Sequence, residues 1–153
     1  MLLVKRLLLV LPLLLTACGG GGDDAQDAYV AEATKVCEVA ETDADALTSP
    51  TSAAGIKPFV DGTLAIATRA QGDLAALTPP PDDAAELEAK VLTPFAELVE
   101  EGKAYAAEVD AAGTDGAKLL ALVAEQPSAE GIDLEYLRSY GLGVCADVID
   151  TSG

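Results

Sequence analysis

The side chains available for chemistry are mainly carboxylates, together with a few tyrosines, lysines and hydroxyls. The 153-residue chain has 26 Asp and Glu, no His and no Trp, and its single Met is Met1. Without His, neither a Ser–His nor a Cys–His nucleophile pair can form, and a His-ligated zinc, copper or non-haem iron site is excluded. We therefore expect a protein that is not an enzyme, with no catalytic residue and no cofactor.

Carboxylates at helical spacing are the remaining candidates for a metal site. Glu97, Glu101 and Glu108 share one face of a predicted helix, a geometry that helical bundles use for carboxylate-bound metals. Those bundles normally pair Glu with a His three residues on, which this chain lacks. The segment Asp110–Gly116 resembles the start of a calcium loop in composition. Counted from Asp110, however, the twelfth position is Ala121, where a calcium loop requires Glu. We expect a solvated acidic face and no metal ion.

The tyrosines are the candidates for a polar group that faces a ligand: Tyr29, Tyr105, Tyr136 and Tyr140. Each is interpreted first as a core residue whose hydroxyl reaches the rim, and a ligand-facing role stays open. A buried cavity lined by tyrosines with an inward carboxylate would favour a small ligand. A filled core and an exposed apolar patch would favour a protein partner.

Cys18 follows a segment with the features of an export signal. Lys5 and Arg6 precede the apolar stretch 7–15, which is too short to cross a bilayer, since crossing requires about 20 helical residues. The run Leu15-Thr16-Ala17-Cys18 resembles the lipobox of bacterial lipoproteins. The resemblance implies that Cys18 is lipidated and that the chain is cut just before it. The alternative is an ordinary secretory signal that is cut after Ala17 or nearby.

The resemblance divides the chain into three parts. Residues 1–17 are the signal peptide, residues 18–26 are the lipidated cysteine and a flexible Gly-rich tether, and residues 27–153 are the folded domain. Two acyl chains suffice for stable anchoring where one does not. The implied location is the extracytoplasmic face of the cell membrane.

The charge of the domain restricts its partners. Residues 1–17 contain two basic residues and no acid, so cleavage before Cys18 changes the formal net charge from −17 to −19. Nucleic acid is not expected as a partner of so acidic a domain. The acidity is interpreted as a solvation device, with dedicated cation binding as the alternative.

Two cysteines remain for the folded domain, Cys37 and Cys145. In an exported domain they most simply form one disulfide, which would close a loop of roughly a hundred residues. The alternative is a pair of buried free thiols.

The hydrophobic pattern predicts helices almost throughout. The predicted fold is all-α, an antiparallel bundle of four to five helices that follows the signal and tether. Pro58 is expected in the first turn of the second helix, and Pro94 is expected to kink the third helix or split it in two. The fourth is expected to be largely buried, because its leucines and valine leave little polar face. The predicted ranges are 27–47, 58–77, 82–112, 116–125 and 132–140, with 142–145 as a short final segment.

A second resemblance spans nearly the whole chain. A lipobox, an early helical cysteine, a Pro-rich break after Leu74-Ala75-Ala76-Leu77, and the terminal Tyr140–Cys145 stretch resemble small helical lipoproteins and secreted proteins common in actinobacteria. This resemblance implies a fold and a compartment, but no catalytic residue.

These observations predict a non-catalytic, lipid-anchored cell-envelope protein. It would be held at the membrane by lipid on Cys18 and would bind another envelope component through a helical surface. The alternative is a small-ligand- or cation-binding lipoprotein that serves a transporter or sensor. The oligomeric state stays open.

Overall fold

The computed structural model describes residues 21–151, and within that range the chain is all-α with no strand. The signal peptide predicted at 1–17 and Cys18 lie outside the described residues. The elements in chain order are α1 (Gly21–Asp45), α2 (Ala53–Ala76), α3 (Ala84–Leu87), the π-helical turn η1 (Glu88–Leu92), α4 (Thr93–Ala112), α5 (Gly116–Val123), the 3₁₀ turn η2 (Ala129–Gly131), α6 (Leu134–Tyr140) and α7 (Gly143–Thr151).

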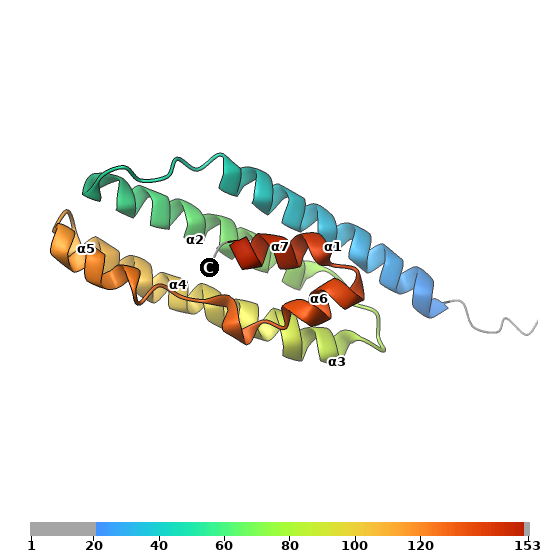
Figure 1. The fold of residues 1–153 in the computed structure, drawn as a ribbon. Helices are drawn as coiled ribbons and strands as arrows, with labels where there is room; N and C mark the ends of the chain where they lie inside the picture. The colour runs from blue at the N-terminus through green and yellow to red at the C-terminus, as the bar shows by residue number, and fades with distance from the viewer. Residues whose placement is uncertain (1–20, 152–153) are drawn as a thin grey trace, which may run out of the picture.

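Three long helices determine the shape of the protein (Figure 1). α2 packs between α1 and α4 and runs antiparallel to both, while α6 and α7 pack together and α7 lies against α1. α5 lies at the end of the structure opposite to the start of α1. One buried stripe of α1 faces the core at spacings of three and four residues, and its members are Tyr29, Ala33, Cys37 and Ala40.

The number and bounds of the helices differ from the prediction. If α3, η1 and α4 are counted as one continuous helix, the described residues hold six helices instead of four to five. The expected final segment 142–145 is the start of an additional helix, α7. α1 begins at Gly21 instead of Asp27, so residues 21–26, which were expected to belong to the flexible tether, are helical.

α2 begins at Ala53, which places Pro58 in its second turn and not in its first. Proline has no N–H to donate to the carbonyl four residues earlier, which here is that of Ala54. Because Ala54 is exposed, water can reach that carbonyl and the helix can extend past the proline.

Pro94 coincides with a change of helix type. The Thr93 N–H donates to the carbonyl of Glu88, five residues back, which defines the π-helical turn immediately before the proline. Pro94 leaves the carbonyl of Lys90 without an intrahelical donor, and the Asp133 N–H donates to it at 3.1 Å. The proline thereby creates a docking point for the segment that leads into α6. The predicted kink stays a prediction.

α5 was expected to be largely buried, and this expectation is wrong. Leu119 is 3% exposed, whereas Leu120 is 74% exposed and Val123 is 56% exposed. Successive helical residues point about 100° apart, so a short helix that packs mainly on α4 can bury only one side.

None of the helices in the described part of the chain is long and apolar enough to cross a bilayer.

Candidate functional site

The structure places Cys37 of α1 and Cys145 of α7 at disulfide distance. Their Sγ atoms are 2.08 Å apart and their Cα atoms are 5.1 Å apart. Both side chains are buried, and they lie 108 residues apart in the sequence. The bridge joins α1 to α7, and it agrees with the disulfide expected for the two cysteines of the domain.

Three of the four candidate tyrosines come together where α1, α3 and α6 meet. The Tyr136 and Tyr140 rings stack with centroids 5.6 Å apart, and the Tyr29 ring meets the Tyr140 ring edge-on at 6.3 Å. Tyr105 lies on α4, and no contact recorded among the described residues joins it to the others. We call Tyr29, Tyr136 and Tyr140 the tyrosine cluster.

The carboxylate of Asp83, the residue just before α3, binds the tyrosine cluster. The Tyr140 hydroxyl donates to Asp83 Oδ2 at 2.7 Å, and Gln26 Nε2 of α1 donates to the Tyr140 carbonyl at 3.3 Å. Tyr29 and Tyr140 are both buried. The polar contacts of Tyr140 therefore hold three separate parts of the chain together.

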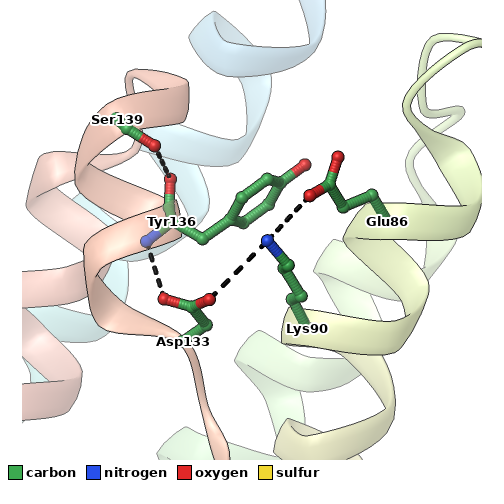
Figure 2. A network of polar contacts seen from close by, with 5 residues as sticks. All are labelled: Glu86, Lys90, Asp133, Tyr136 and Ser139. Atoms are coloured by element: carbon green, nitrogen blue, oxygen red, sulfur yellow. Dashed lines mark hydrogen bonds and ion pairs between the residues drawn. The ribbon is translucent and has the colours of Figure 1, made fainter.

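Lys90 bridges η1 to α6 beside the cluster (Figure 2). Its Nζ lies 2.7 Å from Glu86 Oε1, 3.7 Å from Asp133 Oδ2 and 4.5 Å from the centroid of the Tyr136 ring. Asp133 also caps α6, because its Oδ1 accepts the Tyr136 N–H at 2.8 Å. At the other side of Tyr136, the Ser139 hydroxyl donates to its carbonyl at 2.9 Å.

The environment of the cluster keeps its phenols protonated. Burial, with the charge of Glu86 as a smaller cause, raises the pKa of Tyr136 from 10.0 to about 12. Burial and the hydrogen bond to Asp83 raise the pKa of Tyr140 above its usual value, and burial and Glu88 raise that of Tyr29. The hydrogen bond to Glu86 raises the pKa of Lys90. The phenols therefore stay neutral and the lysine stays charged near neutral pH. Groups that do not change protonation state in this range are poorly suited to exchange protons with a substrate.

Tyr136→Phe should reduce the loss of stability at alkaline pH. In the unfolded chain Tyr136 ionises near pH 10.0, and in the folded protein near 12. The unfolded state therefore releases more protons in this interval, and the free energy of unfolding falls as pH rises from 10 towards 12. Urea denaturation at several pH values should show a shallower fall in the variant.

Lys90, which lies over the Tyr136 ring and whose pKa is also raised, is present in both proteins, so the difference between their curves isolates the phenol. Between pH 7 and 9 the two curves should run parallel. Curves that stayed parallel up to pH 12 would contradict the pKa of Tyr136.

A hollow on the surface lies elsewhere. It is a solvent-open groove of about 620 Å³ between α2 and the continuous helix formed by η1 and α4. None of the four tyrosines lines it. A cavity lined by tyrosines would have favoured a small ligand. This groove is not such a cavity, because the tyrosine cluster lies outside its lining.

The carboxylates singled out from the sequence separate into two locations. Glu97 and Glu101 line the groove, and Glu108 does not. Within residues 21–151 no group of three Asp, Glu or Cys side chains is close enough to hold a metal ion. Asp115, near the end of the segment compared with a calcium loop, instead caps α5 by accepting the N–H groups of Ala117 and Lys118.

Sequence reasoning missed the exposed side of α5 and the carboxylate partner of Tyr140. The sequence Leu119–Val123 is apolar at every position, which indicates burial but cannot say how many neighbours the helix has. Asp83 falls at the start of the predicted helix 82–112, and nothing local links it to a tyrosine 57 residues away.

No protein-family model matches this chain, and none of the curated proteins or solved structures compared with it is significantly similar.

Proposed function

We propose that this is a non-catalytic, lipid-anchored protein of the cell envelope that binds another envelope protein through one side of α5. The exposed apolar residues of that helix, Leu120 and Val123, are called the α5 outer face. They are the observation that carries the proposal.

The anchor and the compartment rest on the sequence. Leu15-Thr16-Ala17-Cys18 resembles a lipobox and follows a basic and then an apolar segment. The disulfide distance between Cys37 and Cys145 supports an oxidising compartment outside the cytoplasm, since structural disulfides are rare in cytosolic proteins.

The α5 outer face supports a protein partner. Single exposed apolar residues are common, but Leu120 and Val123 are three residues apart and therefore neighbours on one helical surface. Burying two such side chains against a partner would contribute roughly 1.5–3 kcal/mol for each when it is complete.

The position of α5 fits a partner on the side away from the membrane. Only Gly19 and Gly20 separate Cys18 from Gly21, so the lipidated residue would lie within roughly 11 Å of the start of α1. α1 alone is about 37 Å long at 1.5 Å per residue. α5 lies at the opposite end of the structure (Figure 1), where the lipid on Cys18 would leave it accessible.

Photo-crosslinking at the α5 outer face tests the proposal. A photoreactive amino acid in place of Val123 should give a discrete crosslinked protein band in the envelope of the native host. Adding Leu120→Ser should remove most of that band, because it removes the neighbouring apolar contact. The substitution should change folding stability by less than about 0.5 kcal/mol, since Leu120 is largely exposed.

Val39 supplies the matched control, because it is another exposed valine, 53% accessible, on α1. The photoreactive group at position 39 should not give the same band. Equal bands from positions 39 and 123, or no discrete band from 123, would contradict the proposed surface. A saturable thermal shift with a metabolite or divalent cation in that case would favour the ligand-binding alternative.

A further inference from the structure

The groove between α2 and the η1–α4 helix has an apolar floor and one acidic side, which the η1–α4 helix supplies. Its apolar lining comes from both helices and consists of Ala75, Leu92, Ala96 and Val99. Its charged lining consists of Glu88, Glu97, Glu100, Glu101 and Lys103. We call this surface the α2–α4 groove.

The carboxylates of the groove are only partly neutralised. Lys103, the single cation in the lining, pairs with Glu100 at 2.6 Å. Glu88 accepts a hydrogen bond from the Thr93 hydroxyl at 2.9 Å. Glu97 and Glu101 form no ion pair with any residue in the described part of the chain, and both are exposed. The groove therefore presents uncompensated negative charge beside apolar surface.

The spacing of these carboxylates points to an extended occupant. They run from Glu88 to Glu101, about 20 Å along the helix axis at 1.5 Å per residue. No three of them converge in the way that a metal ion requires. A ligand that uses the whole groove must carry positive charges at several points and apolar side chains between them.

We propose that the α2–α4 groove binds a basic amphipathic helical segment of another protein. Its apolar side chains would lie on Ala75, Leu92 and Ala96, and its Lys or Arg side chains would reach the glutamates on the η1–α4 side. About 14 residues of helix match the length of the groove. A second copy of this chain does not fit, because its net charge is also −17 and like charges oppose association.

This binding mode is independent of the lipid anchor and of the α5 outer face. It is supported by the residues that line the groove and by the net negative charge of the chain. A chain without lipid, or without a partner on α5, would still be expected to bind such a segment.

A synthetic peptide provides the probe. It has 14 residues, with leucines at i, i+4, i+7 and i+11 on one helical face and lysines flanking them, and it carries a fluorophore for anisotropy measurements. The purified full chain should bind it saturably. Glu97→Gln combined with Glu101→Gln should weaken binding about fivefold at low salt, because two exposed ion pairs contribute roughly 0.2–1 kcal/mol each.

Glu38→Gln combined with Glu41→Gln is the matched control. Both residues are exposed on α1 and outside the groove, and the variant loses the same two charges. It should weaken binding by less than twofold, and circular dichroism should show that both variants fold. An equal loss in the two variants would mean diffuse attraction and would overturn the proposal.

The apolar floor is tested separately. Replacing the leucines of the peptide by serine should weaken binding further than the Glu97 and Glu101 substitutions do. Spermine, which carries charge without apolar side chains, should compete only weakly. Absence of saturable binding, equal binding of the serine peptide, or spermine binding as tight as that of the leucine peptide would each overturn the proposal.

Discussion

Replacing Cys37 and Cys145 together by alanine should lower the free energy of unfolding by several kcal/mol. The bridge closes a segment of 108 residues, for which the chain-entropy model gives up to about 4.7 kcal/mol. It also joins α7 to α1, so its loss allows the C-terminal helix to separate early. Alanine is preferred to serine because both positions are buried and a serine hydroxyl would lack a partner. Urea denaturation of the two proteins measures the difference.

Reductant supplies the control for this experiment. It should destabilise the wild-type protein to about the level of the double variant, and it should leave the double variant unchanged. If the native protein yields two freely alkylated thiols, or if the double variant is as stable as the wild type, the bridge does not form and the buried-thiol alternative is correct.

Local signals predicted much of the helical structure. Gly113 and Gly141 adopt positive φ at the ends of α4 and α6, a conformation that favours glycine and ends a helix. Asp115 caps α5, next to the predicted start of that helix at residue 116. These features depend on a few consecutive residues and their backbone preferences, so no knowledge of the tertiary neighbours was needed.

Features that depend on neighbours were not predictable in the same way. The α5 sequence has the composition of a buried helix, yet α4 is its main neighbour, and a helix covered on one side leaves Leu120 and Val123 outside. Pro94 indicated an irregularity at the right place. The π-helical turn and the bond from the Asp133 N–H to the freed Lys90 carbonyl depend on a loop some forty residues later.

The candidate site shows the same division. The tyrosines were selected because few other side chains in this composition combine an aromatic ring with a polar group. Three of them cluster because α1 and α6 both pack near α3, whereas Tyr105 lies on α4. Glu97 and Glu101 were correctly placed on one helical face, but only the packing of α2 against α4 turns that face into the wall of a groove.

Replacing Cys18 by alanine should abolish lipid attachment, so the variant should carry no lipid anchor. Cys18 is the residue that the lipobox resemblance identifies as the acceptor, and a thiol is required for the thioether bond to the lipid. Cells grown with labelled fatty acid should incorporate label into the wild-type protein and none into the variant. Uncleaved precursor should accumulate, because in bacterial lipoproteins lipidation precedes cleavage.

The double variant at Cys37 and Cys145 is the matched control, since it removes the other two cysteines of the chain and leaves Cys18. It should keep the label, which would assign the lipid to Cys18 alone. Label that persists on the Cys18→Ala protein would refute the lipoprotein assignment. A wild-type protein that is cut near Ala17 and carries no lipid would instead indicate an ordinary secretory signal. In that case no lipid would hold the protein at the membrane. The α5 outer face and the α2–α4 groove would then belong to a released domain.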